Sequence, residues 1–564
     1  MQVTDDGGDR SANDDHGGNA TPAKSSSNAT PANSSFSSSS SSSFSSSAAT
    51  AAADRKPAKH DADDDDDDDD DCSMLAAARR HTRQQLKADQ NALGSSCPYL
   101  DTVDRSQLDF DFEKVCSVSL SDFNIYACLI CGKYFQGRGV QSHAHTHSLE
   151  SDHRVYINLS TLKVYCLPDN YEVIDPSLND IRAVIRPTFT PAAIQQLDTV
   201  SRQSVGLDGV LYLPGVVGLN NIIHNDYMNV IIQMLNRIQP LRDFLLSSQA
   251  DEACKTPLTS AASELFRKIW NPRNFKGHVS PHVMLQSIAS ASSKRFTLAQ
   301  QADPSDLLSW LLNTFHTDLG GTRRSGSSII HKIFQGSMKM ISRKMPAVVD
   351  EEEASEEPAV HAAKRARLEE DVAEDEYEDK VSESPFMFLS LDLPPAPLFK
   401  DETGKNFIPQ VPITTLLDKF DGVTEKEYKT GRDLFMKRFI LTSLPQYLIL
   451  VVRRFTKNNF FLEKNATIVN FPLRGLDMRD YVENAAAVGS TTYDLVANIY
   501  HDGSLEAGQG TYHAHVLHKA TKSWYLMQDL HVNQILPQLI VLAEAYILVY
   551  ERRNTATSSS NMQA

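Results

Sequence analysis

The sequence predicts an α+β protein in which a small zinc-binding unit precedes a larger folded unit. Its 564 residues are enough for two or three folded units with tails. Five of its seven cysteines fall between positions 97 and 166, which indicates a metal site in a reducing compartment rather than a disulfide framework. Farther along, apolar residues recur at helical spacing over residues 227–244, and residues 388–393 alternate as a strand does. The larger unit should therefore contain both helices and strands.

The composition is that of an acidic protein, with a net charge of -17. This balance argues against a broad nucleic-acid-binding surface, although it leaves a local basic patch open. No run of eighteen apolar residues occurs, so the sequence predicts no transmembrane helix. The N-terminus has no apolar segment of the kind found in a signal peptide. We expect no membrane partner.

The ends of the chain and one internal segment lack the apolar residues needed for a core. Residues 1–95 are rich in serine and contain an unbroken aspartate run at 63–71, so they predict a disordered tail. Residues 349–384 predict a disordered acidic insertion, and residues 554–564 a disordered C-terminal tail. Within the insertion, the basic residues at 364–367 fit either a nuclear-import signal or charges in a solvated loop.

The segment after the N-terminal tail has the ligands of a structural zinc site. Cys128 and Cys131 form a Cys-x-x-Cys pair that supplies two thiolates, and His147 and His153 supply two imidazoles. Four such ligands without an open position describe a structural rather than a catalytic zinc. The spacing of His147 and His153 lies at the upper end of the usual range, so His143 paired with His147 is an alternative.

Residues 97–170 resemble the UBP-type zinc finger, which recognises the ubiquitin C-terminus and often precedes ubiquitin-specific protease domains. We place this domain at residues 96–200. The match rests on the Cys-x-x-Cys pair, on Gly137-Arg138 and on His143, His147 and His153. Members of that family hold up to three zinc ions, but the resemblance implies one here, bound by Cys128, Cys131, His147 and His153. The two other sites are incomplete: Cys97, Tyr99, Cys166 and Asp169 occupy one, and Cys116, Ser119, Gln136 and His143 occupy the other.

The ubiquitin-tail pocket of that finger is also altered. Arg138 matches the family's tail-binding arginine, but the family's Trp-Cys-Tyr wall reads Tyr165-Cys166-Leu167 here. The thinner aromatic wall argues against capture of a free diglycine tail. The resemblance therefore fits a folded unit that binds another protein or RNA better than a ubiquitin receptor.

Residues 205–553 resemble the catalytic domain of the ubiquitin-specific proteases. The segment 218–233 reads GLNNIIHNDYMNVIIQ and is in register with the family's nucleophile box, but Asp226 stands where the nucleophilic cysteine belongs. A cysteine at a helix N-terminus beside a histidine has a lowered pKa and attacks a carbonyl, whereas an aspartate is a poor substitute. We expect Asp226 to serve as the N-cap of the following helix rather than as a nucleophile. Asn221 matches the family's oxyanion-hole position.

Two further motifs carry the same resemblance. Residues 300–308 read QQADPSDLL, like the family's Gln-Gln-Asp-Ala-x-Glu-Phe helix, so Leu307, Leu308, Leu311 and Leu312 should be core residues. Residues 444–455 read LPQYLILVVRRF, like a family strand. Active members often pin a finger subdomain with zinc held by two Cys-x-x-Cys pairs, but this chain has no cysteine after Cys254.

The remaining catalytic positions are replaced as well. Residues 510–516 read GTYHAHV, so Thr511 stands where the general base should be, and Gln528 stands where the orienting carboxylate should be. His513 lies two residues along the same strand and on the same face, which displaces its ring by roughly 6–7 Å from the base position. Since proton transfer needs about 2.6–3.2 Å or one bridging water, His513 is not expected to act as the base.

Taken over residues 97–553, the resemblance implies a papain-like hand of thumb, palm and fingers preceded by the zinc finger. With one zinc and three replaced catalytic residues, the chain resembles one branch of the family, the non-peptidase subunits of the spliceosomal tri-snRNP of the tri-snRNP-associated protein 2 type. That branch implies a nuclear role in pre-mRNA splicing, supporting tri-snRNP assembly or stability, with tri-snRNP proteins and their small nuclear RNAs as partners. Two alternatives stay open: a ubiquitin-binding adaptor, and a deubiquitinase with an unforeseen catalytic constellation.

Overall fold

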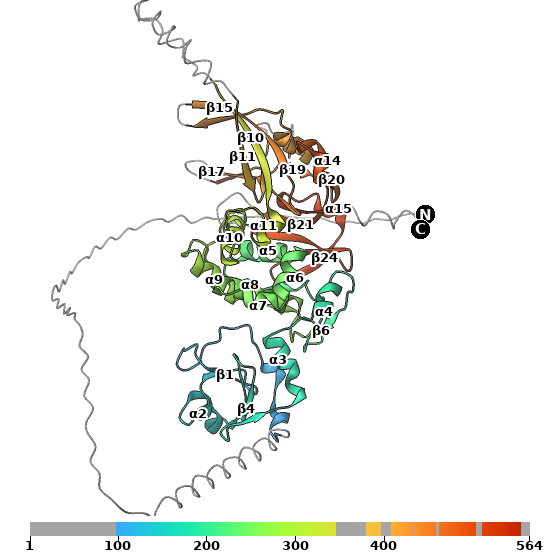
Figure 1. The fold of residues 1–564 in the computed structure, drawn as a ribbon. Coiled ribbons are helices and arrows are strands. Elements are labelled where there is room, and N and C mark those ends of the chain that lie inside the picture. The colour runs from blue at the N-terminus through green and yellow to red at the C-terminus, as the bar shows by residue number, and fades with distance from the viewer. Residues whose placement is uncertain are drawn as a thin grey trace, which may run out of the picture. The chain divides into compact units, whose positions relative to one another are not determined.

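A computed structural model describes residues 97–345, 379–395, 408–430, 433–457, 462–503 and 510–553 (Figure 1). The predicted tails at 1–95 and 554–564 and the basic residues at 364–367 lie outside the described residues. No described helix combines the length and the apolar character needed to cross a membrane.

The N-terminal unit is built on an antiparallel sheet of order β2-β1-β3-β4-β5. Its strands are β1 (Ile125–Cys128), β2 (Tyr134–Gln136), β3 (Val155–Asn158), β4 (Val164–Cys166) and β5 (Tyr171–Val173). Helix α2 (His143–Glu150) contacts β2, and α3 (Asn179–Ile185) and α4 (Pro191–Gln196) follow the sheet. The turn between β1 and β2 requires Gly132, because its φ is +72° and an added Cβ would lie 2.3 Å from the Gln107 carbonyl oxygen.

A run of helices follows, and it forms the thumb of the hand. The helices are α5 (Asp226–Leu235), α6 (Gln239–Leu246), α7 (Gln249–Ala253), α8 (Pro257–Trp270), α9 (His282–Ala291), α10 (Pro304–Asp318) and α11 (Ile329–Phe334). The expectation of one helix over 227–244 is wrong, because the chain breaks after Leu235 and restarts at Gln239. Pro240 explains the restart, since proline fits the first turn of a helix but not its interior. The helix expected after residue 300 is confirmed as α10, with Asp303 capping Ser305 N at 2.7 Å, and its four leucines are buried as predicted.

An eight-stranded sheet forms the palm, in the order β12-β16-β25-β21-β22-β23-β24 with β20 paired to β21. Its strands are β12 (Leu389–Asp392), β16 (Tyr447–Arg453), β20 (Arg474–Asp477), β21 (Thr492–Asp502), β22 (Thr511–His518), β23 (Ser523–Gln528), β24 (His531–Ile535) and β25 (Ala545–Arg552). Strand β16 separates two hydrophobic cores. Tyr447, Ile449 and Val451 face the core shared with the thumb helices, and the alternate residues face the second core. Burial of both faces explains its unbroken apolar sequence.

A second sheet, of order β11-β10-β15-β14, forms the fingers. Its strands are β10 (Gly336–Met345), β11 (Lys380–Phe386), β14 (Lys426–Thr430) and β15 (Asp433–Ser443). The predicted insertion extends too far, because residues 380–384 pair with Ser342–Met338 of β10. All five of these β11 residues are exposed. Because neither face of the strand is buried here, the sequence shows no alternation of apolar and polar residues that would predict a strand.

Short elements complete the described fold. The two-stranded pairs are β6 (Ser204–Val205) with β7 (Leu211–Tyr212), β8 (Gly218–Leu219) with β9 (His278–Val279), β13 (Gln410–Pro412) with β19 (Ile468–Asn470), and β17 (Phe455–Lys457) with β18 (Leu462–Lys464). The short helices are α13 (Ile413–Leu417), α14 (Ala485–Val488) and α15 (Pro537–Ile540), and single 3-10 turns occur at Leu100–Thr102, Arg105–Gln107, Pro176–Leu178, Asp418–Phe420 and Arg479–Tyr481.

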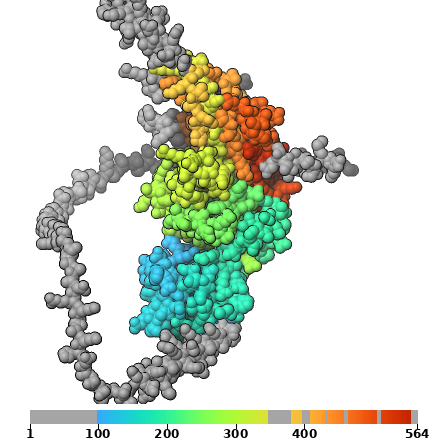
Figure 2. Space-filling model, viewed as in Figure 1, coloured from blue at the N-terminus to red at the C-terminus, as the bar shows by residue number. Residues whose placement is uncertain are grey.

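An acidic segment ahead of β1 joins the N-terminal unit to the thumb. The ammonium group of Lys268, on the buried side of α8, donates to Phe110 O at 3.1 Å and to Asp111 Oδ1 at 3.0 Å. Asp109 pairs with Lys276 at 2.6 Å, and Glu113 accepts from His282. These bonds satisfy a lysine that would be costly to bury alone, so they fix where the two surfaces meet (Figure 2).

Candidate functional site

Asp226, at the nucleophile position, is 3% exposed and is the first residue of α5. The expectation that it is the N-cap is wrong, because Asn225 occupies that position. The carboxylate instead reaches across the site, where Oδ2 accepts from Gln301 Nε2 at 2.7 Å and from the backbone N–H of Tyr512 at 2.9 Å. One side chain therefore connects the thumb helix, the segment before α10 and palm strand β22.

Burial raises the pKa of Asp226, and the hydrogen bonds from Tyr512 and Gln301 oppose that rise. As a carboxylate, Asp226 is acceptor-only, which suits the two N–H donors aimed at it. No hydrogen bond joins it to a histidine within the described residues. Its geometry is that of a buried structural acceptor rather than that of an activated nucleophile, which needs a base within hydrogen-bond reach.

Thr511, at the base position, begins β22 and is exposed. Its Oγ1 lies 2.8 Å from Nε2 of His513, so the prediction that both side chains share one face of the strand is confirmed. The His513 ring turns toward Thr511 and stacks on Tyr500 with ring centroids 5.0 Å apart. Burial lowers the pKa of His513, and its Nδ1 has no hydrogen-bond partner within the described residues. A third group that would orient this imidazole is therefore missing there.

Gln528, at the orienting position, is the last residue of β23, and its side chain makes no hydrogen bond in the described part of the chain. The next residue, Asp529, is the carboxylate that the site uses. Its Oδ1 accepts from Asn229 at 2.8 Å and its Oδ2 from Asn221 at 2.9 Å. Asn221, the oxyanion-hole position, thus donates to a carboxylate.

Sequence reasoning assigned no role to Gln301, Asn229 or Asp529, although the first two lie in quoted motifs and Asp529 directly follows Gln528. Asn225 belongs to the same network, since its amide donates to Asn220 O and to Asn229 Oδ1, each at 3.1 Å. The position of these residues beside the catalytic motifs could have marked them as part of the site. Their hydrogen-bond partners could not be predicted, because those partners are distant in the sequence. The network leaves the residues of the candidate site bonded to one another.

The predicted zinc ligands form one cluster, with their ligand atoms all within 4.8 Å of one another. Cys128 Sγ lies 3.5 Å from His153 Nδ1, Cys131 Sγ lies 3.4 Å from His147 Nε2, and the two imidazole nitrogens are 3.2 Å apart. Ordinary zinc–sulfur and zinc–nitrogen bonds in a tetrahedron give edges of about 3.5 Å for S···N and about 3.3 Å for N···N. The three S···N and N···N distances thus match the edges of a tetrahedral zinc site.

Neighbouring groups orient these ligands. Ser151 Oγ lies 3.2 Å from Nδ1 of His147, the ring nitrogen that faces away from the cluster, and Phe135 stacks on the same ring at 4.2 Å. His143, the alternative ligand, is not part of the cluster. The two incomplete sites are occupied by protein contacts: the Tyr171 hydroxyl donates to Cys97 Sγ at 3.2 Å, and Cys116 Sγ accepts from Ser119 N at 3.4 Å.

Arg138, at the ubiquitin-tail position, is engaged within its own domain. Its guanidinium lies 4.1 Å from the centre of the Tyr165 ring and donates to Asn170 Oδ1. The contact with Asn170 engages one nitrogen of this guanidinium, Nη1. The loop residues Ile222 and Ile223, beside the nucleophile position, are 40% and 57% exposed.

Comparisons with known proteins match both parts of the chain. A family model described as ubiquitin carboxyl-terminal hydrolase matches residues 217–550, and one described as a zinc finger in ubiquitin hydrolases and other proteins matches residues 116–178. The chain is 52% identical to ubiquitin carboxyl-terminal hydrolase 39 of Homo sapiens, over 81% of this chain and 80% of that protein.

Two fungal relatives and one solved structure extend the comparison. The chain is 41% identical to the probable mRNA-splicing protein ubp10 of Schizosaccharomyces pombe, over 80% of this chain and 88% of that protein. It is 29% identical to the pre-mRNA-splicing factor SAD1 of Saccharomyces cerevisiae, over 84% and 98% respectively. A crystal structure described as an essential yeast splicing factor has a TM-score of 0.63 and 27% identity, covering 81% of this chain and all of that chain.

Proposed function

Because the chain belongs to the ubiquitin carboxyl-terminal hydrolase family, we propose that it is a non-catalytic member that acts in pre-mRNA splicing. In this role it supports the assembly or stability of the tri-snRNP in the nucleus. The observation that carries the proposal is the match, over four fifths of the chain, to fungal relatives named as splicing proteins. The partners are tri-snRNP proteins and their small nuclear RNAs.

The state of the catalytic positions supports a role without catalysis. Asp226 is occupied by two N–H donors, Thr511 contacts His513 rather than Asp226, and Gln528 orients no base. Loss of a nucleophile or base in comparable triads costs on the order of 10⁶ in turnover. The hand then serves for binding rather than for cleavage.

We assign one structural zinc ion to Cys128, Cys131, His147 and His153. The match to the family's zinc-finger model supports zinc binding, and the tetrahedral spacing of the four ligand atoms supports this set. The occupied half-sites at Cys97 and Cys116 support a single ion. The zinc supplies folding stability to the finger and takes no part in a reaction.

A ubiquitin-binding adaptor is the second candidate, because Arg138 is retained at the tail-binding position. Arg138 already contacts Asn170 and Tyr165, and the aromatic wall beside it is thinner than the family's, so this function ranks below the splicing function. An active deubiquitinase would need a catalytic pair other than the residues at positions 226, 511 and 528.

A pull-down from nuclear extract separates these functions. Tagged full-length protein should recover spliceosomal proteins and the small nuclear RNAs of the tri-snRNP, identified by mass spectrometry and RNA sequencing. An Arg138→Ala variant should recover the same set, because the splicing function does not use the ubiquitin-tail position. Recovery dominated by ubiquitin conjugates, and lost in the Arg138→Ala variant, would replace the splicing proposal with the adaptor.

A further inference from the structure

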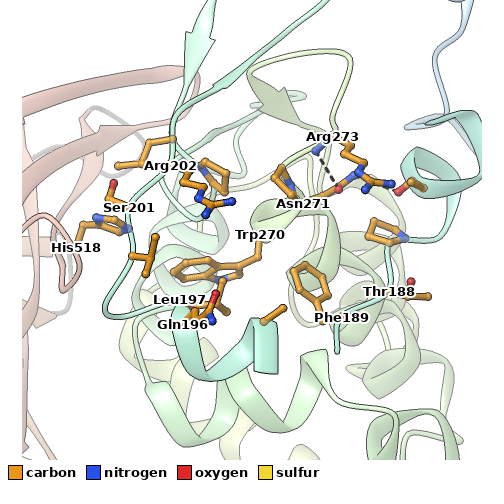
Figure 3. Close-up of a pocket in the computed structure, with 17 residues that line it drawn as sticks. Thr188, Phe189, Gln196, Leu197, Ser201, Arg202, Trp270, Asn271, Arg273 and His518 are labelled. Atoms are coloured by element: carbon orange, nitrogen blue, oxygen red, sulfur yellow. Dashed lines mark hydrogen bonds between the residues drawn. The ribbon is translucent and has the colours of Figure 1, made fainter. Parts of the chain in front are cut away.

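A cavity of about 380 Å³ opens where the linker after the finger meets the thumb, far along the sequence from the catalytic motifs. Its apolar lining includes Phe189, Leu197, Leu213 and Trp270. Figure 3 shows Phe189, Leu197 and Trp270 around the hollow. The indole nitrogen of Trp270 donates to Asn236 at 2.6 Å, so the ring offers the cavity carbon atoms and no unsatisfied donor. The volume suits one large side chain or a short peptide segment.

The edge of the cavity carries uncompensated positive charge. Arg202 and Arg273 line it and are exposed, and neither guanidinium forms an ion pair or hydrogen bond with the described residues. Among the described residues, no aspartate or glutamate lines the cavity. The nearby Asp198 is already paired with Arg242, through two bonds of 2.7 and 2.8 Å. In a chain with a net charge of -17, two free arginines beside an apolar hollow are a local exception.

His518, which also lines the cavity, does not add to this charge at neutral pH. Burial, together with the positive charges of Arg237 and Arg242, lowers its pKa to about 4. Its ring is therefore neutral. Among the residues that line the cavity, Arg202 and Arg273 therefore carry the charge.

Apolar surface continues outward from the cavity edge. The lining residues 200–202 and 213–214 are joined by the β6–β7 hairpin. Val205 and Leu211 are direct cross-strand partners on this hairpin, and each is 60% exposed. Leu207 and Val210, in the turn between the strands, are 53% and 56% exposed. Neighbouring exposed apolar residues of this kind are typical of a protein-binding surface.

We propose that this cavity and the adjoining hairpin form a docking site for an acidic peptide segment of a partner protein. A bulky apolar side chain of the segment fills the cavity against Trp270, and flanking carboxylates pair with Arg202 and Arg273. The apolar lining and the exposed hairpin favour a peptide over single-stranded RNA, which would need a longer basic track. The inference rests on this surface alone and stands whether or not the splicing proposal holds.

Ala193 gives a way to block the cavity without touching the core. It lies on the exposed side of α4 and lines the cavity, so Ala193→Trp should fill the space. Ala192→Trp is the matched control, because Ala192 is exposed on the same helix but does not line the cavity. Arg202→Glu and Arg273→Glu test the charge, and Arg323→Glu is their control at an exposed arginine elsewhere.

The probe is a displayed library of random twelve-residue peptides selected on full-length protein and counter-selected on the Ala193→Trp variant. We expect enrichment of peptides that combine several carboxylates with one aromatic or leucine side chain. Ala193→Trp, Arg202→Glu and Arg273→Glu should each weaken a selected peptide at least about tenfold, and the two controls should leave its affinity unchanged. Circular dichroism and thermal unfolding verify that each variant is folded.

Three results would overturn the proposal. The first is a library that yields no peptide dependent on the open cavity. The second is selected peptides that lack carboxylates or bind the arginine variants as well as the wild type. The third is a labelled oligouridylate that binds the wild type, is lost in both arginine variants and displaces the selected peptide, which would assign the site to RNA.

Discussion

The finger and the hand each carry a set of residues inherited from an enzyme family, and the two sets differ in how their polar atoms are satisfied. In the zinc cluster, four ligand atoms converge within 4.8 Å, a spacing that suits a shared ion. In the former active site, Asp226, Asn221 and Asn229 all take partners from the protein itself. The zinc cluster therefore has ligand atoms directed at a shared ion, whereas the polar atoms at the catalytic positions are satisfied by hydrogen bonds within the protein and stabilise its fold.

The largest effect should come from breaking the zinc cluster. Cys128→Ser should unfold the finger, because apparent zinc-binding free energies of about 10–16 kcal/mol in zinc-finger peptides are coupled to folding. Limited proteolysis should then cut within residues 97–185, and metal analysis of the wild type should return about one zinc per chain. Cys254→Ser, at a cysteine outside the cluster, should change neither result. A wild-type value near three would mean that the Cys97 and Cys116 half-sites also bind metal.

The next effect tests whether Asp226 stabilises the hand. Asp226→Ala removes the acceptor of Tyr512 N and one acceptor of Gln301, and an unsatisfied buried donor costs about 1–3 kcal/mol. We expect a loss of this size in the free energy of denaturant unfolding. Asp306→Ala is the control, since its pair with Arg295 is exposed and worth at most about 1 kcal/mol. Equal losses in both variants would contradict the structural role of Asp226.

A smaller effect should appear in the pH dependence of stability. Burial raises the pKa of Asp226, so the folded state loses stability relative to the unfolded state as this group ionises with rising pH. Burial would also raise the pKa of Asp198, but the hydrogen bonds and charge of Arg242 outweigh it and hold that pKa below its usual value. The stabilisation by Asp198 is therefore present above the usual carboxyl pKa and is lost as the pH falls below it.

These opposite signs can be read from unfolding free energies measured between about pH 3 and pH 7. Relative to the wild type, Asp198→Asn should become more destabilising as the pH rises. The destabilisation by Asp226→Asn should instead shrink over the same range. If both differences moved in the same direction, the two carboxyl groups would not be in the contrasting environments described above.

The smallest expected effect is on catalysis. Asp226→Cys alone should give no measurable release of a fluorophore from a ubiquitin C-terminal amide, because neither Thr511 nor Gln528 can supply or orient a base. Adding Thr511→His and Gln528→Asp restores the three groups in principle, and we expect slow turnover that increases when Ile223→Gly is included. Wild-type turnover that disappears in Asp226→Ala would show instead that the native site is catalytic.

The sequence was sufficient for the architecture because the family motifs lie on the elements that build it. The helix after residue 303 and the strands at 447–453 and 511–518 occupy the expected places. The break between α5 and α6 could have been predicted from Pro240, which fits only the first turn of a helix. The apolar residues continue at helical spacing through the break, so spacing alone predicted one helix. Strand β11 could not be found from periodicity, because most of its residues are exposed and show no alternation of apolar and polar side chains. Its strand conformation is fixed by pairing with β10, which the sequence pattern does not reveal.

The candidate site was predictable in position but not in bonding. Positions 226, 511 and 528 follow from motif register alone. The partners of Asp226 lie 75 and 286 residues away in the sequence, so no local pattern could assign them. The zinc cluster was the easier case, since its ligand types and spacings define the metal chemistry before any fold is known.

The β10–β11 pair has a consequence for how this family can vary. Asp379 pairs with Arg343 at 2.9 Å and with Arg438 at 2.7 Å, so the last residues of β10 and the first of β11 are held together. Once the ends are held together, doubling the length of the connecting chain costs only about 0.6 kcal/mol in closure entropy. Between Met345 and Asp379, evolution, or an engineer adding a reporter domain, can therefore lengthen the chain at little thermodynamic cost.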